Sequence, residues 1–219
     1  MKLSKRLSIL ASFVKENDIV ADIGCDHAQL CCALVNSKKI DKAYACDIAQ
    51  GPLMQAMKTI EYYNLQDKVI TVLSDGLQKI HEDVTCIVIA GMGFETVAHI
   101  LNQDIDKLDN KRIIVQVNRD VEGLRKWISD HNYHILSEKC VLEDQHYYQI
   151  VVFDTTYDTS LSEDEILFGR KMEKDNEFYS QWKFKLSQYE KMLRNMKEDA
   201  SRYSEVLSLM IKIYTLFSK

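Results

Sequence analysis

Apolar and polar positions over the first 154 residues alternate between strand-like and helix-like patterns. Short apolar runs rich in Val and Ile, typical of buried strands, occur at 19–24, 42–48, 69–76, 85–93 and 112–118. Stretches with three- and four-residue apolar spacing follow four of these runs, at 27–37, 51–65, 94–105 and 121–131, and another amphipathic stretch precedes the first run. This alternation predicts a parallel sheet with helices on both faces.

The pattern changes after residue 131. Two strand patterns, 133–144 and 146–154, follow each other with no helix between them, which predicts an antiparallel pair. A plain dinucleotide-binding domain would be expected to end on another parallel strand. The sequence therefore favours an α/β fold with a Rossmann-like class I methyltransferase sheet and an antiparallel terminal hairpin.

The C-terminal part reads as helix after a polar break. Residues 155–165 predict a linker, and beyond them apolar residues recur at three- and four-residue steps over 178–196 and again over 206–217. Two such stretches joined near Glu198–Ser201 predict an antiparallel helical hairpin of coiled-coil type. We therefore expect a catalytic domain over 1–158 and a helical coiled-coil domain over 159–219.

Composition restricts the class of protein. Hydrophobic residues make up 46% of the chain and charged residues 28%, as in ordinary globular proteins. No apolar run reaches bilayer length and the N-terminus lacks a signal-peptide pattern, so we expect a cytoplasmic protein without membrane contact. The six cysteines form no C-x-x-C pair, which predicts reduced thiols and no metal site. We expect a monomer.

The first strand pattern ends in an acid and a glycine turn. Asp22 and Gly24 are followed by Asp26 and His27 at the start of a helix pattern, where a turn and a helix N-terminus favour a bound carboxylate or phosphate. A dinucleotide fingerprint needs G-x-G-x-x-G, and this turn has one glycine, so a pyrophosphate fits poorly. S-adenosylmethionine (SAM) has no phosphate: its carboxylate fits the turn and its ammonium fits beside Asp22. The alternative is a junction that binds nothing.

Three further strand patterns end in residues of the same kind. Asp47, followed by Ile48, is placed to accept both ribose hydroxyls, with a helix cap as the alternative. Asp75-Gly76 is placed to accept the adenine amino group, or forms an ordinary turn. Gly91-Met92 brings backbone close to whatever lies over the sheet edge, or serves helix packing. Because open α/β sheets bind ligands at the carboxyl ends of their strands, the agreement of four ends favours a cofactor site.

At these residues the sequence resembles the TrmK family, bacterial tRNA methyltransferases that modify N1 of adenine 22. The Asp-His pair after the glycine turn, the AGMG segment and the Q-x-N segment carry most of the specificity. The chain has Leu30-Cys31, AGMGF and QVN where the family usually has Leu-Pro, AGMGG and QPN, and these changes leave the polar groups in place. The resemblance covers nearly the whole chain, through SKRLSILASFV (4–14), DIGCDHAQL (22–30), DIAQGPL (47–53), SDGL (74–77), AGMGFETVAHIL (90–101), QVNRD (116–120), LRKWI (124–128), Glu143 and YYQIVV (147–152).

The resemblance implies SAM as cofactor, the D-arm region of tRNA as substrate, and a C-terminal coiled coil that helps to hold the RNA. On that basis the carboxylate of Asp26 is expected to accept the adenine N6–H and orient N1, with a helix cap as the alternative. His27 is expected to contact the base or a phosphate, or to cap the helix that follows. Asn118 is expected to hydrogen-bond the flipped base, or to form a turn.

Charge permits contact with RNA without requiring it. The net charge of −5 excludes a uniformly basic nucleic-acid binder. Residues 160–219 hold eleven Lys and Arg against ten Asp and Glu, a balance of +1, which leaves −6 for the rest. Arg6, Lys2 and Lys5 are candidates for contact with the RNA backbone, although a solvated helix face explains the two lysines.

Three functions remain after this reading. The first is tRNA adenine-N1 methylation, the second is SAM-dependent methylation of a small molecule or a protein, and the third is RNA binding by a catalytically inactive Rossmann-like protein. The acids and glycines at the strand ends argue against the third, and the helical appendage argues against a small-molecule substrate.

Overall fold

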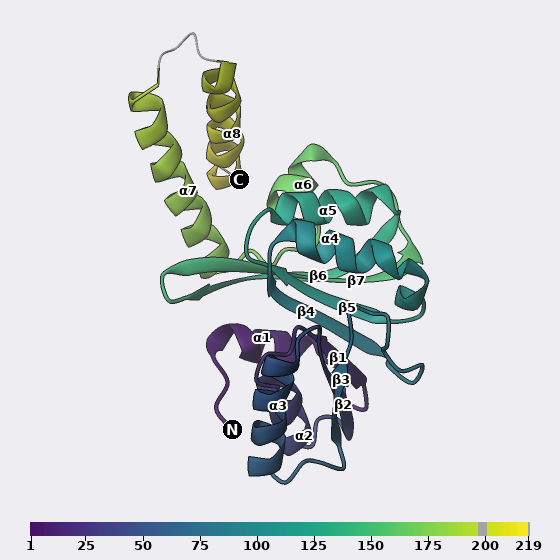
Figure 1. The fold of residues 1–219 in the computed structure, drawn as a ribbon. Helices are drawn as coiled ribbons and strands as arrows, with labels where there is room; N and C mark the ends of the chain where they lie inside the picture. Colours follow the sequence, from purple (N-terminus) through teal and green to yellow (C-terminus); the bar gives the residue numbers. More distant parts are fainter. Residues whose placement is uncertain (197–200, 219) are drawn as a thin grey trace. The chain divides into compact units, whose positions relative to one another are not determined.

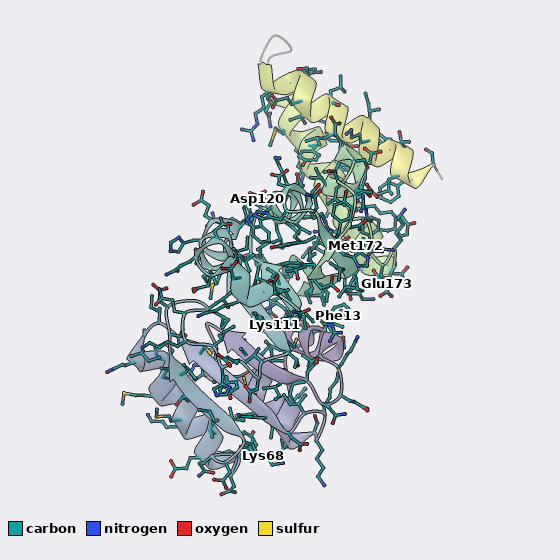
Figure 2. The ribbon with its side chains drawn as sticks, turned by 90° about the vertical axis from the view of Figure 1, so that its right-hand side faces the viewer. Phe13, Lys68, Lys111, Asp120, Met172 and Glu173 are labelled. Carbon is teal, nitrogen blue, oxygen red and sulfur yellow. The ribbon has the colours of Figure 1, made fainter. Side chains whose placement is uncertain are left out.

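The computed structural model describes residues 1–196 and 201–218. The chain forms two compact units, Met1–Met172 and Glu173–Lys219. The two residues at this division, Met172 and Glu173, are labelled in Figure 2. Each unit is described separately below.

The first unit is built on one seven-stranded sheet with the strand order β3-β2-β1-β4-β5-β7-β6. The first five strands are parallel, and β7 pairs antiparallel with both β5 and β6. This topology confirms the predicted α/β class and the antiparallel terminal hairpin (Figure 1). The strands are β1 (Ile19–Ile23), β2 (Lys42–Asp47), β3 (Val69–Leu73), β4 (Cys86–Met92), β5 (Arg112–Val117), β6 (Tyr133–Glu143) and β7 (His146–Tyr157).

Helices cover both faces of the sheet (Figure 1). Alternate strand residues point to opposite faces, so Val20 and Val88 join the apolar cluster beneath one group of helices while Ala21 and Ile87 join the cluster beneath the other. One face carries α1 (Lys5–Phe13), α2 (Gln29–Asn36) and α3 (Gln50–Tyr62), and the other carries α4 (Phe94–Gln103), the short 3-10 helix η1 (Ile105–Leu108) and α5 (Val121–Asp130).

The boundary between the units falls later than residue 158, because the segment predicted as a linker is tied to the sheet. A short helix, α6 (Glu163–Phe168), begins inside this segment, where the sequence predicted a linker. Arg125 and Glu138 form a fully buried ion pair with an Nε to Oε1 distance of 2.6 Å. Arg125 also donates to the carbonyl oxygens of Ile166 and Leu167, and Glu138 accepts from the Lys171 N–H at 2.9 Å. These bonds tie the residues just after the predicted linker to the first unit.

The second unit contains α7 (Asn176–Arg194) and α8 (Ser201–Phe217). The two helices run antiparallel, since the Tyr179 ring near the start of α7 lies 5.8 Å from the Phe217 ring at the end of α8. Tyr214 adds a hydrogen bond of 3.0 Å to Glu190. The two antiparallel helices of the predicted hairpin are present, and residues 197–200, where most of its predicted turn falls, lie outside the described residues. Within the described residues, no helix is long and apolar enough to cross a bilayer.

Candidate active site

The carboxyl ends of the parallel strands meet along one edge of the sheet. In the strand register Ile23 pairs with both Cys46 and Ile89, and Asp47 pairs with Leu73. The strand order reverses between β1 and β4, which is where open α/β sheets bind their ligands. The four strand ends singled out in the sequence are therefore neighbours in space.

A cavity of about 480 Å³ opens at this reversal point. Its walls come from the N-terminal segment and α1, the end of β1 with the turn into α2, the end of β4, and the end of β6. The lining includes five of the predicted site residues, Asp22, Gly24, Asp26, His27 and Gly91. The other lining residues are Ser4, Arg6, Leu7, Cys25, Gln29, Leu30, Ala90 and Glu143.

Asp22 is a buried carboxyl group on the wall of this cavity. Burial, together with the negative charge of Asp47, raises its pKa from 3.8 to about 7. The Cys31 thiol lies 3.9 Å away and the positive charge of Arg6 acts in the opposite direction, but Asp22 forms no ion pair within the described residues. A buried carboxyl group of this kind is suited to a cationic ligand group, which would restore the charged form.

Two glycines let the backbone approach the cavity. Gly24 and Gly91 have φ angles of 74° and 81°, in the left-handed region that favours glycine. A Cβ atom at Gly24 would clash with Cε of Met92, so the β4 end packs directly on the β1 turn. Met92 is thereby placed against the predicted cofactor turn, although it is not one of the residues that line the cavity.

Asp26 and His27 lie on the rim of the cavity rather than in a helix. Asp26 and Ala28 have φ angles of 49° and 53°, and α2 begins at Gln29 with Ala28 as its N-cap and no side-chain cap. The alternative that Asp26 or His27 caps this helix is therefore wrong. The Asp26 side chain is 75% exposed, and its one ion-pair approach among the described residues is to His27, whose Nε2 lies 3.5 Å from Oδ1. Its carboxylate is therefore accessible at the rim of the cavity.

The next two strand ends continue along the same edge, beyond the lining of the cavity. Asp47 Oδ1 accepts the Ala49 N–H at 2.9 Å, which leaves its second oxygen for a ligand hydroxyl. Ile48 is 66% exposed, as expected of a side chain that a flat ligand would cover. Asp75 is half-buried, and Gly76 has a φ of 52° and packs against Ile100.

Asn118 belongs to a hydrogen-bond network that holds the Gly91 turn. Its Nδ2 donates to the Gly91 carbonyl oxygen at 2.7 Å, and its Oδ1 accepts from Nε2 of the fully buried Gln116 at 3.1 Å. Gln116 Oε1 in turn accepts from the Gly91 N–H at 3.2 Å and from the Arg6 guanidinium. Asn118 therefore supports the Gly91 turn, and its contact with the base stays a prediction.

Arg6 was predicted only as a candidate contact for the RNA backbone, and Glu143 was assigned no role. The Arg6 backbone N–H donates to Glu143 Oε1 at 2.8 Å, and its guanidinium lies over the Tyr148 ring. Burial alone would raise the pKa of Glu143, but the hydrogen bonds from Arg6 and Ser4 and the charge of Arg6 hold it below its usual value. Arg6 therefore faces the cavity rather than open solvent. The available signal was a polar glutamine inside the apolar run at 112–118, which needs a partner.

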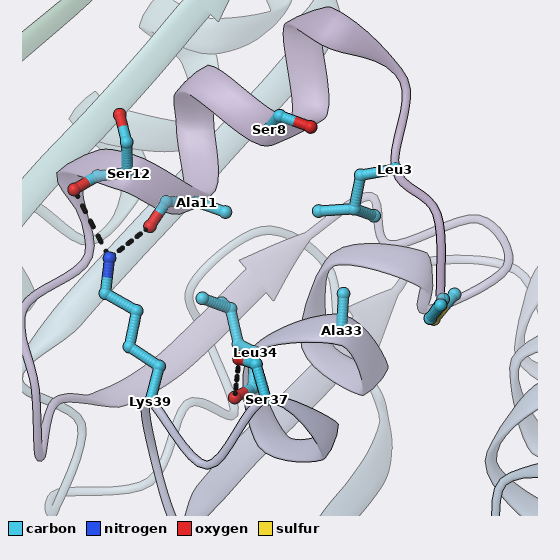
Figure 3. A pocket seen from close by; sticks show the side chains of 9 residues that line it. Leu3, Ser8, Ala11, Ser12, Ala33, Leu34, Ser37 and Lys39 are labelled. Carbon is cyan, nitrogen blue, oxygen red and sulfur yellow. Dashed lines mark hydrogen bonds between the residues drawn. The ribbon is translucent and has the colours of Figure 1, made fainter.

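The cavity between α1 and α2 does not resemble a catalytic centre. A cavity of about 350 Å³ between α1 and α2 (Figure 3) is bordered by Lys39, whose Nζ donates to the carbonyl oxygens of Ala11 and Ser12 at 2.7 and 3.3 Å. These bonds satisfy the C-terminal carbonyl groups of α1. Among the described residues, no three His, Cys, Asp or Glu side chains are grouped so as to hold a metal ion.

Comparison with known proteins defines the class and then the family. Residues 3–151 match the family described as "Methyltransferase domain", so the protein is a methyltransferase by fold and by the position of its cavity. The chain is 32% identical over 209 residues to the tRNA (adenine(22)-N(1))-methyltransferase of Bacillus subtilis, covering 91% of this chain and 88% of that protein. It belongs to that family of tRNA methyltransferases.

Solved structures agree over the full length of the chain. TrmK of M. capricolum, in complex with the cofactor product S-adenosyl-homocysteine, has a TM-score of 0.88 at 34% identity, covering 100% of this chain and 99% of that one. A Streptococcus pneumoniae protein in complex with S-adenosyl-L-methionine has a TM-score of 0.89 at 31% identity, covering 98% of this chain and 99% of that one.

Proposed function

We propose that this protein transfers the methyl group of SAM to N1 of adenine 22 in tRNA. The observation that carries the proposal is the buried, unpaired carboxyl group of Asp22 on the wall of a cavity at the reversal point of a methyltransferase sheet. Membership of the tRNA (adenine(22)-N(1))-methyltransferase family gives the target base.

The residues at the sheet edge fit SAM. Asp22 matches the ammonium of its methionine part, and the open turn at Gly24 gives its carboxylate access to the backbone. The second oxygen of Asp47 accepts ribose hydroxyls, Ile48 covers the adenine ring, and Asp75 accepts its amino group. When bound, SAM supplies an electrophilic methyl group on a sulfonium ion.

The protein's part in the reaction is to position the base and balance its charge. N1 of adenine has an in-plane lone pair, so attack needs alignment more than proton removal. The base must leave its stack to reach the cavity. The exposed Asp26 carboxylate accepts the N6–H and offsets the positive charge that develops on the ring. His27 contacts the base or its phosphate, and the second N–H of Asn118 donates to the base.

Substrate capture involves the second unit. The α7–α8 hairpin acts as an arm that holds tRNA, and the protein acts as a monomer in the cytoplasm. A mild balance of basic over acidic residues in 160–219 supports contact with RNA.

The test is methylation of a defined transcript. The protein is incubated with methyl-labelled SAM and an unmodified tRNA transcript, beside a matched transcript that has guanine at position 22. Label should enter only the first transcript, and primer extension should stop at adenine 22, because a methyl on N1 blocks base pairing. Label at another nucleotide, or label in small molecules or proteins of an extract but not in tRNA, would replace this function with the alternative substrate class.

A further inference from the structure

A second cavity adjoins the one that holds the proposed active site. It has a volume of about 340 Å³ and shares two wall residues, His27 and Gln29, with the first cavity. We call this second cavity the α3 groove, because most of its remaining wall is one face of α3. The two cavities are neighbours across a single turn. A polymer with one residue bound in the first cavity can therefore continue into the second.

The α3 groove has the chemistry of a nucleic-acid surface. Gln55, Lys58, Thr59 and Tyr62 recur at three- and four-residue steps and so lie on one face of the helix. Lys58 is exposed and makes no ion pair within the described residues, and no acidic side chain lines the groove. An unpaired ammonium beside amide and hydroxyl groups is suited to phosphate and sugar contacts.

Tyr62 adds a platform for stacking. Its side chain is 78% exposed, which is unusual for a large aromatic residue without a ligand. The neighbouring Tyr63 ring stands edge-on to it, with centroids 4.9 Å apart, and Tyr63 packs against the apolar core. This support restricts the Tyr62 ring before any ligand arrives, so stacking a base on it costs little conformational entropy.

We propose that the α3 groove binds the tRNA strand next to the target adenine, with a base stacked on Tyr62 and a phosphate against Lys58. The inference rests on the proposed function, since a base that flips into the cavity leaves its covalently joined neighbours at the mouth. His27 and Gln29, which line both cavities, mark the point where the strand passes from one to the other. Stacking on an aromatic ring tolerates any base, so the groove contributes affinity and placement rather than sequence recognition.

The test compares tRNA binding by single variants of the full chain. Fluorescence anisotropy of a labelled transcript should show Kd rising on the order of tenfold for Tyr62→Ala and several-fold for Lys58→Ala, with a weaker salt dependence in the latter. Tyr62→Phe keeps the ring and should bind nearly as wild type. Tyr157→Ala removes an equally exposed tyrosine, 80% exposed at the end of β7, and should have no effect.

SAM affinity and thermal stability should stay unchanged in all four variants, because none of these side chains lines the cofactor cavity or the core. Two failures are distinguishable. Wild-type protein that does not methylate adenine 22 overturns the proposed function. Wild-type turnover together with tRNA binding by Tyr62→Ala equal to that of Tyr157→Ala overturns the α3 groove alone.

Discussion

The guanidinium of Arg6 donates a hydrogen bond to the side-chain oxygen of Gln116, although the two residues lie 110 positions apart in the chain. The same oxygen accepts the Gly91 N–H, and the Gln116 amide nitrogen donates to Asn118. One buried amide thus connects the N-terminal helix, the β4 turn and the β5 end. The first two line the cavity of the proposed active site, and the β5 end supports the β4 turn from beside it.

Gln116→Leu should disturb this connection while preserving side-chain size. Leucine cannot accept from Arg6 or Gly91. The Gly91 N–H and the largely buried Arg6 guanidinium therefore each lose a hydrogen bond, although Arg6 keeps its contacts with Glu143 and the Tyr148 ring. We expect the free energy of unfolding to fall by about 1–3 kcal/mol and methyl transfer to fall by a larger factor than SAM affinity. Chemical denaturation and single-turnover methylation measure the two effects.

The matched control is Gln103→Leu, the same change at an exposed position near the end of α4. It should leave both quantities close to wild type. Equal behaviour of the two variants would reduce Gln116 to a residue without a role in the site.

The acidity of Asp22 predicts a pH-dependent cofactor affinity. Burial, and then the charge of Asp47, raise its pKa to about 7, with Arg6 and the Cys31 thiol acting in the other direction. An ammonium group binds best to the ionised carboxylate, so SAM affinity should fall as pH drops below 7, by at most about tenfold per pH unit. Calorimetric titration from about pH 5.5 to about pH 7.5 tests this, and Asp22→Asn should show weak affinity with no such slope.

The free energy of unfolding of the ligand-free protein should change with pH in the opposite direction to the SAM affinity. The folded state keeps a proton on Asp22 that the unfolded chain releases between pH 3.8 and about 7, so the contribution of Asp22 to the free energy of unfolding falls as pH rises through this window. Above it, Asp22→Asn should be more stable than wild type, by up to about 4 kcal/mol for a shift of this size. If Asp22→Asn melts at or below the wild-type temperature at about pH 8, burial of the ionised Asp22 carboxylate does not destabilise the folded protein, and this prediction is wrong.

The strand-end residues could be predicted because each follows an apolar run directly. Periodicity predicts the strands, and parallel strands align their carboxyl ends. Asp22, Asp47 and Gly91 therefore occupy the same edge of the sheet. Arg6 and Glu143 could not be placed in this way, since their contact depends on how α1 packs against β6 and no local pattern encodes it. The Asp26 turn was also beyond prediction, because left-handed backbone at a non-glycine residue has no periodic signal.

Asp26→Asn separates catalysis from structure. Asparagine tolerates the left-handed backbone of this position as well as aspartate does, so the melting temperature should stay close to wild type. The amide carries no negative charge and offers an N–H toward the adenine N6–H, so single-turnover methylation at saturating SAM should fall by about two orders of magnitude. SAM affinity should change far less. A near-normal rate would remove Asp26 from the catalytic residues. In that case Asp26→Ala should lower stability through strain in the left-handed backbone and leave the rate of methyl transfer unchanged.

The later domain boundary changes the fragment that should fold. A fragment ending at residue 158 lacks the carbonyl oxygens of Ile166 and Leu167 and the N–H of Lys171, which are partners of the buried Arg125–Glu138 pair. Leaving buried charged groups without their hydrogen-bond partners costs about 1–3 kcal/mol or more for each group. We therefore expect residues 1–158 to be markedly destabilised or unfolded, and residues 1–172 to melt cooperatively.

The longer fragment then tests the α7–α8 hairpin as a tRNA arm. Residues 1–172 contain the whole cofactor edge and should bind SAM with an affinity close to that of the full chain. Their kcat/KM for tRNA should drop at least tenfold, because part of the phosphate contact is lost with the hairpin. Calorimetry with SAM is the control for folding. A fragment that binds SAM and methylates tRNA as efficiently as the full chain would show that substrate capture lies wholly within the first unit, and would leave the α3 groove as the principal RNA contact.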